Sequence, residues 1–313
     1  MSAASTAAIN YTLTQYAAGL MNDLADVRKV LDAICPIVPV QGATGQFKIF
    51  DDKNSFTVYA TDRPLGGDAR RISFAASDGS FSCKPQALAV TVDDFERQLA
   101  GTDNALKQQL LDQGKIRALI NATMLSHVDK VITYVLANTT AVSDRGNWSN
   151  TDIDPIDQID EYLEDLAKNV GRSSGITITM GVSAWRAFRA HPKVKARTEG
   201  VQISGITMEQ AKGLFMFPVN LVVGAISKLT SGEGQTTKTK GRVIGDVCFM
   251  SYAVPGATLY DPTPFKCFTN GTAGMLDQVR SYRDEPHTEV HLVDWSEDIK
   301  STGTGAIRRF NIT

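Results

Sequence analysis

The four cysteines are the side chains of this sequence that first suggest a metal site or a nucleophile. Cys35, Cys83, Cys248 and Cys267 lie far apart, and no two have the Cys-x-x-Cys spacing of a zinc site. Cysteines scattered in this way are mostly small buried apolar residues. The spacing therefore favours four core cysteines over a metal centre.

Three histidines leave a choice between a ligand and a structural residue. His127 lies near the apolar stripe of a long helical segment, where a hydrogen-bonded core histidine is the usual case. His287 and His291 are four residues apart, which would bring them together on a helix. The alternation around them is that of a strand, so a metal site is the weaker interpretation at both places.

Motifs of enzymatic chemistry do not form a convincing constellation. The chain has no His-Glu-x-x-His zinc motif. Residues 231–238 faintly resemble a phosphate-binding loop but lack its Gly-x-x-x-x-Gly-Lys-[Ser/Thr] spacing, so we interpret them as a flexible basic loop. We expect no catalytic residues, no cofactor and no bound metal.

Composition and charge narrow the functional classes further. The chain has 313 residues, 42% of them hydrophobic, which suits one large domain or two smaller ones. A net charge of -2 argues against a dedicated nucleic-acid binder. The N-terminus lacks the basic and apolar regions of a signal peptide, and no apolar run is long enough to cross a bilayer. We expect a protein made and kept in a cytoplasm.

The N-terminal region predicts a helix after a short polar arm. Apolar residues recur at helical spacing from Leu13 to Ile34 and include Leu20 and Leu24. Two prolines at 36 and 39 then predict an extended segment over 36–40.

Residues 45–90 predict a long β-hairpin that cannot form a core of its own. The outgoing arm covers 45–50 and 56–59, a turn follows at 63–67, and the return arm covers 70–74 and 81–83. Few of these residues are apolar, and an isolated hairpin is marginally stable in water. We therefore expect the hairpin to lie on a neighbouring subunit.

A long helix and a mixed region follow. Residues 104–138 have helical periodicity, with a possible interruption at Gly114, and would span about 50 Å. An acidic helix at 156–170 carries Asp160, Glu161 and Glu164, whose carboxylates suit a solvated face better than a cation site. Strands mixed with helices up to about residue 260 predict an α+β or α/β subdomain. Late strands at 278–282 and 289–295 predict a hairpin beside the long helix.

These pieces, in this order, resemble the major capsid proteins of tailed bacteriophages with the Hong Kong 97 fold. The resemblance rests on segments spread over nearly the whole chain: 27–40, 45–50, 61–67, 176–180, 185–194 and 214–219. It implies an α+β fold with an N-terminal arm at 1–44 and an extended loop at 45–90. It further implies a peripheral domain of 91–150 and 261–313 with a spine helix, and an axial domain at 151–260.

The resemblance also implies a function and partners. The chain would form hexamers and pentamers of an icosahedral shell, assembled in the bacterial cytoplasm with scaffolding, portal and possibly decoration proteins, and would contact packaged double-stranded DNA nonspecifically. The candidate residues for contact between subunits are Phe56, Tyr59, Arg63, Arg70, Arg71, Phe74, Leu20, Leu24, Asp160, Glu161, Glu164 and Trp295.

Two features of some relatives do not transfer, and three other classes stay open. A long N-terminal scaffolding segment does not fit, so scaffolding would come from a separate protein or this would be a processed form. A Lys–Asn crosslink cannot be matched either. The alternatives are an encapsulin-type shell, a gene-transfer-agent shell and, more remotely, a soluble enzyme, which would need a deep polar pocket and would leave the hairpin unexplained.

Overall fold

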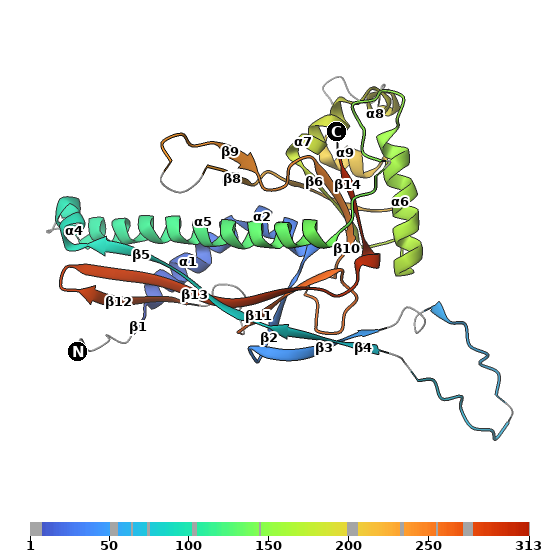
Figure 1. Cartoon of the computed structure of the whole chain (residues 1–313), viewed down its shortest axis with the longest axis horizontal. Coiled ribbons are helices and arrows are strands. Elements are labelled where there is room, and N and C mark those ends of the chain that lie inside the picture. The colour runs from blue at the N-terminus through green and yellow to red at the C-terminus, as the bar shows by residue number, and fades with distance from the viewer. Residues whose placement is uncertain are drawn as a thin grey trace.

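The computed structural model describes residues 8–50, 56–63, 65–73, 76–101, 105–143, 145–198, 206–231, 235–254, 256–271 and 278–312. One sheet lies along a long helix, a second sheet stands at the end of that helix, and a narrow loop projects from the same end (Figure 1).

The larger sheet is built around one long strand. Its path is β1-β12-β13-β11-β2, and β5 also pairs with β13. The pairs of β13 with β12, β11 and β5 are antiparallel, whereas β2 joins β11 in parallel. The strands are β1 (Ala8–Ile9), β2 (Ile37–Val40), β5 (Lys84–Asp93), β11 (Phe265–Asn270), β12 (Val279–Glu285) and β13 (Thr288–Ser301).

The spine helix α5 (Ala105–Asn138) packs along this sheet. Its 34 residues span about 51 Å, and Gly114 does not interrupt it. The predicted apolar stripe is the buried face, running from Ile116 to Val135. Two further helices, α1 (Tyr11–Asp23) and α4 (Asp94–Gly101), contact α5, whereas α2 (Ala25–Ile34) contacts strands of the smaller sheet.

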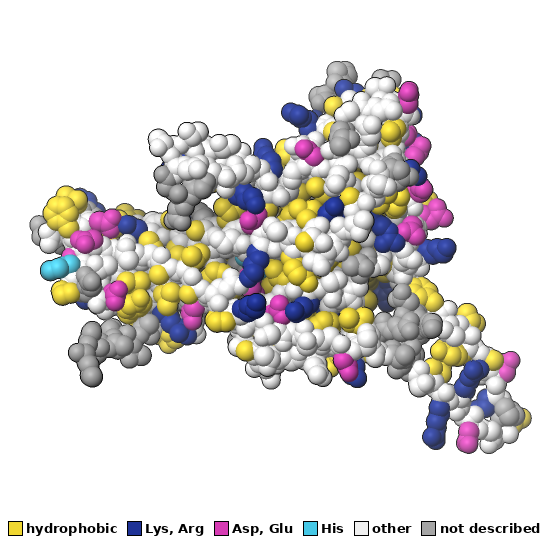
Figure 2. All heavy atoms as spheres, in the orientation of Figure 1, with side chains coloured by type: hydrophobic (Ala, Val, Ile, Leu, Met, Phe, Trp, Pro, Cys, Tyr) yellow, Lys and Arg dark blue, Asp and Glu magenta, His cyan; other side chains and the backbone are white. Residues whose placement is uncertain are grey.

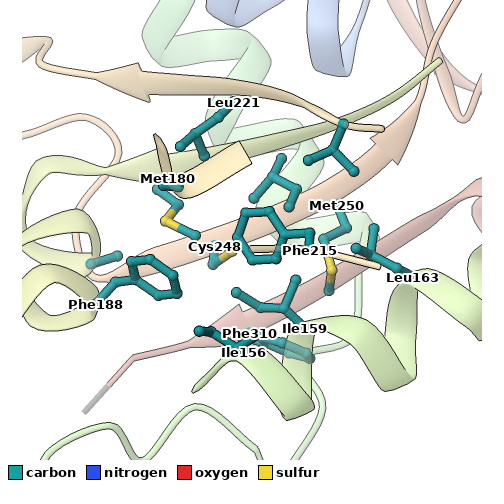
Figure 3. Close-up of a cluster of buried hydrophobic side chains, with 14 of the residues drawn as sticks. Ile156, Ile159, Leu163, Met180, Phe188, Phe215, Leu221, Cys248, Met250 and Phe310 are labelled. Atoms are coloured by element: carbon teal, nitrogen blue, oxygen red, sulfur yellow. The ribbon is translucent and has the colours of Figure 1, made fainter. Parts of the chain in front are cut away.

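The smaller sheet has the order β14-β10-β6-β7 and carries the second core. Side chains from the sheet and from α6 meet in one apolar layer, with Ile159, Met250 and Phe310 fully buried (Figure 3). Its elements are α6 (Pro155–Val170), β6 (Ile176–Gly181), α7 (Val182–Ala190), α8 (Pro192–Thr198), α9 (Met208–Lys212), β7 (Asn220–Gly224), β10 (Val247–Tyr252), η1 (Thr304–Ala306) and β14 (Ile307–Asn311). A separate hairpin joins β8 (Ser227–Leu229) to β9 (Lys240–Arg242).

The boundaries of α6 follow from its sequence. The Asp154 carboxylate accepts a hydrogen bond from the backbone N–H of Ile156, and Pro155 occupies the first helical position. Gly171 ends the helix in the left-handed conformation, at φ 73°. This helix therefore ends where the predicted acidic helix does and begins one residue earlier, at Pro155.

The structure corrects several expectations of secondary structure. The helix predicted over 13–34 is two helices that meet at Leu24, because α1 packs against α5 whereas α2 turns toward β7 and β10. Residues 57–63 and 67–73 form no strand, although strands were predicted at 56–59 and 70–74. The strands β5, β11 and β14 were not predicted. Sheet membership also differs from the predicted ranges, since β5 belongs to the larger sheet and β14 to the smaller one.

Candidate assembly interface

The projecting loop begins at a two-stranded root made of β3 (Thr44–Phe50) and β4 (Ala76–Ser82). Gly45 faces Phe81 across the ladder, and Phe47 faces Gly79. Each ring covers the glycine opposite it so closely that an added Cβ would lie 2.5 Å from Phe81 and 2.4 Å from Phe47. These reciprocal pairs fix the register of the hairpin.

The root is anchored on the body of the protein. The Phe81 ring stacks on Phe268 of β11 at 4.6 Å between centroids, and the Phe47 ring lies 5.1 Å from it. The Ser82 N–H donates to the Asp298 carboxylate of β13 at 2.7 Å. The loop therefore projects from a packed base.

Beyond the root, the described residues 56–63 and 65–73, here called the distal loop, are exposed except for the half-buried Tyr59 and Gly67. Val58 is 97% exposed and Leu65 is fully exposed, with a relative accessibility of 106%. Phe56 and Ile72 are about half exposed, at 49% and 42%. Burying an apolar side chain stabilises a structure by about 1.5–3 kcal/mol. The distal loop makes little use of this stabilisation within its own chain.

The distal loop also carries three exposed arginines. Arg63, Arg70 and Arg71 share it with two aspartates, and Figure 2 shows basic and hydrophobic side chains together along the projection. The Arg70 guanidinium lies 5.5 Å from the centre of the Tyr59 ring. The third aromatic candidate, Phe74, lies outside the described residues.

The predicted carboxylates of α6 do not converge on a cation site. Glu161 pairs with Arg145 at 3.0 Å, and Asp160 accepts a hydrogen bond from the backbone N–H of Met216 at 3.0 Å. Burial raises the pKa of Asp160, and that hydrogen bond partly offsets the effect. Glu164 is exposed on the same helix. These groups lie on a solvated face.

The remaining candidates lie in the core of their own chain. Leu20 is 7% exposed and belongs to a cluster that includes Leu119 of α5. Leu24 and Trp295 pack against the same cluster and are partly buried. These three side chains pack mainly within their own subunit.

A buried charge cluster lies between α5 and the larger sheet, and its carboxylate, Glu297, was not singled out from sequence. The Glu297 carboxylate lies 2.5 Å from His127 Nδ1 and accepts a hydrogen bond from Lys130 Nζ at 2.9 Å. Burial by itself raises the pKa of Glu297, but His127 and Lys130 outweigh it and lower that pKa to about 2. The interpretation of His127 as a hydrogen-bonded core histidine is confirmed.

Cys267 lies near this cluster, and the three side chains could in principle approach one ion. The chemistry argues against it. Burial raises the pKa of the Cys267 thiol, and the nearby Cys35 raises it further. Lys130 already brings a positive charge to the carboxylate. A metal would have to displace an internal ion pair, so the cluster is better explained as a structural one.

The pair His287 and His291 and a Gly-x-Ser-x-Gly spacing do not form a functional site. His291 is 1% exposed and bonds Ser281, whereas the side chain of His287 is 82% exposed near Asp94. The sequence does contain one Gly-x-Ser-x-Gly spacing, at 171–175. It joins a helix to a strand, the reverse of the strand-to-helix elbow that presents a nucleophile.

Comparison with known proteins identifies the family. Residues 87–246, just over half of the chain, match the family model described as phage major capsid protein E. The chain belongs to this family. It is a major capsid protein, and its role is to assemble with copies of itself into a shell. No protein in the curated set matches it.

Solved structures support the fold of the capsid protein. A phage-related protein from Bordetella bronchiseptica RB50 has a TM-score of 0.73 at 20% identity, covering 98% of this chain and 97% of that chain. A virus-like particle from Pyrococcus furiosus has a TM-score of 0.54 at 10% identity, covering 95% and 97%. The mature capsid of bacteriophage PhiM1 has a TM-score of 0.50 at 12% identity, covering 90% and 86%. The predicted α+β fold of the Hong Kong 97 type is confirmed.

Proposed function

We propose that this capsid protein builds an icosahedral shell around the double-stranded DNA of a tailed phage by laying its distal loop over the next copy in a ring. The observation that carries the proposal is an exposed apolar and basic loop held on a packed root. The loop and the surface that it covers differ, so the contact is heterologous, and such contacts form rings when the rotation between copies closes, here hexamers and pentamers.

The arginines of the distal loop supply the polar part of this contact. We expect at least one of Arg63, Arg70 and Arg71 to form an ion pair with a carboxylate of the neighbouring copy, because guanidinium matches carboxylate in two-point geometry. Glu164 is exposed for such a pair, whereas Asp160 and Glu161 already have partners in their own chain.

We propose that the domain boundaries follow the two sheets. The arm would be 8–34, the loop with its root 44–82, and the peripheral domain the larger sheet with α4 and α5. The axial domain would be 145–254 together with 307–312. The smaller sheet would then surround the centre of each ring.

Contact with the packaged DNA would be weak and nonspecific. Two lysines of the spine, Lys115 and Lys130, pair with Glu96 and Glu297. Lys107 and Arg117 are exposed on the same helix. Scattered charges of this kind give no strong phosphate-neutralising field.

The role proposed here is structural, without catalytic chemistry. Assembly would take place in the bacterial cytoplasm, with separate scaffolding and portal proteins and possibly a decoration protein. No helix among the described residues is long and apolar enough to cross a bilayer.

Negative-stain microscopy of the purified full chain tests the proposal, alone and with its scaffolding partner. Closed shells are expected in at least one of the two samples, and shells recovered from infected cells should contain double-stranded DNA. Persistent monomers in both samples would contradict the proposal. Shells filled with protein cargo instead of DNA would favour a compartment of the encapsulin type.

A further inference from the structure

The strand β5 has one edge that no other strand joins in the part of the chain that the structure describes. Along its ten residues, Lys84 to Asp93, it pairs with β13. No other described strand joins it, so its second edge presents backbone N–H and C=O groups for pairing.

This edge lacks most of the features that prevent strands from pairing between molecules. Proteins commonly protect an exposed edge with charged side chains, prolines or bulges. From Gln86 to Val92 the strand contains no charged residue and no proline, and Pro85 lies only at its start. The side chains on the exposed face are small, namely Ala87, Ala89 and Thr91. The side chains of an added strand would therefore meet little crowding on that face.

The distal loop contains a segment that favours a strand by its sequence but is not in one. Residues 58–61, Val-Tyr-Ala-Thr, include β-branched and aromatic residues of high strand propensity, yet they form no strand. Val58, Ala60 and Thr61 are exposed. A strand-forming sequence without a partner strand in the described part of its own chain is a local conflict that a second chain would resolve.

We propose that residues 58–61 of one copy add as a strand to the free edge of β5 in the next copy. The parallel orientation places Arg63, which follows the segment, toward Asp93 at the end of β5, so opposite charges meet. Main-chain hydrogen bonds then provide the affinity, as in other strand-addition interfaces. This inference rests on the proposed function and names the surface that the loop covers.

Cysteine crosslinking in assembled shells tests this contact. Ala60→Cys and Thr61→Cys are each combined with Ala87→Cys, Ala89→Cys or Thr91→Cys in the full chain. The four native cysteines are buried, so the background should be low. Adjacent strand residues point to opposite faces, and only one of the two loop positions should crosslink to the β5 series. The readout is a ladder of covalent multimers on a non-reducing gel.

The result separates the inference from the proposed function. A ladder from one loop position, and none from the control pair Ala60→Cys with Lys195→Cys, supports strand addition. Shells that form but give no ladder, or equal ladders from both loop positions, overturn it and leave the proposed function standing. Failure of the unmodified chain to form shells overturns both.

A proline pair gives a second measurement that does not depend on cysteine. In a strand paired along one edge, only alternate residues donate to the partner. One of Ala60→Pro and Thr61→Pro should lower the yield of shells by about tenfold, and the other should change it little. Equal effects of the two variants would overturn the inference.

Discussion

The cluster around Glu297 and the distal loop differ in where their side chains find partners. At Glu297, a carboxylate with 0% side-chain exposure has two partners from α5 in the same chain. In the distal loop, Val58 and Leu65 are almost wholly exposed on a packed root. The subunit completes its contacts along the spine and leaves them open where, under the proposed function, a second copy binds.

The largest effect is expected for Glu297→Ala, which tests how much the buried cluster stabilises the subunit. It leaves His127 buried without its partner and should lower the free energy of unfolding by about 3–5 kcal/mol. Asp294→Ala on the same strand is the matched control, because its pair with Arg280 is exposed and should be worth at most about 1 kcal/mol. Denaturant unfolding of unassembled subunits measures both. Equal losses would contradict the account of the buried cluster.

The contribution of Glu297 to the free energy of unfolding should disappear over a defined range of acidic pH. The pKa of Glu297 is lowered from 4.5 to about 2, so its stabilisation is present above pH 4.5 and is lost as the pH falls toward 2. The difference in unfolding free energy between the native chain and Glu297→Gln should shrink over that range. A difference that stays constant down to pH 2 would show that the carboxylate is not held in its charged form.

The root of the loop can be tested with two glycines that differ in their surroundings. Gly79→Ala places a Cβ about 2.4 Å from the Phe47 ring and should destabilise the hairpin by about 1–3 kcal/mol. Gly114→Ala meets nothing within 4 Å and should stabilise the spine by about 0.5–1 kcal/mol. Hydrogen exchange at residues 44–50 and 76–82 reports the first effect, and denaturant unfolding reports the second. A stabilising Gly79→Ala would refute the close packing at the root.

The smallest effect per contact is expected at the arginines of the loop. Reversing Arg70 and Arg71 to glutamate should lower the assembly yield and change its dependence on salt, although each exposed pair is worth only about 0–1 kcal/mol. A shell repeats the contact many times, which makes the effect measurable by sedimentation. The double lysine variant keeps the charge and serves as the control. An unchanged yield and salt dependence in the glutamate variant would remove these arginines from the interface.

The comparison also explains which parts of the structure could be predicted from sequence. The spine was predictable because its stripe from Ile116 to Val135 follows helical spacing. The partners of Glu297 were not, since they lie 167 and 170 residues away in the chain. Strands such as β11 lack a clear alternation, because five of its six residues are buried.

In the distal loop, the sequence predicted a strand that the structure does not contain. Its strand propensity was recognised over 56–59, but a strand needs a neighbour, and the described part of this chain does not provide one there. Under the proposed function, local preference and tertiary structure disagree at this place because the missing contact belongs to another copy. The same reasoning connects Val58 to β5 in the proposed interface.

Cryo-electron microscopy of the assembled shell tests the central claim most directly. The account predicts that residues 56–73 bury most of their apolar surface against a neighbouring subunit, while Phe47 and Phe81 keep their contacts with Phe268 in the same chain. A reconstruction in which the distal loop packs only against its own chain would contradict it.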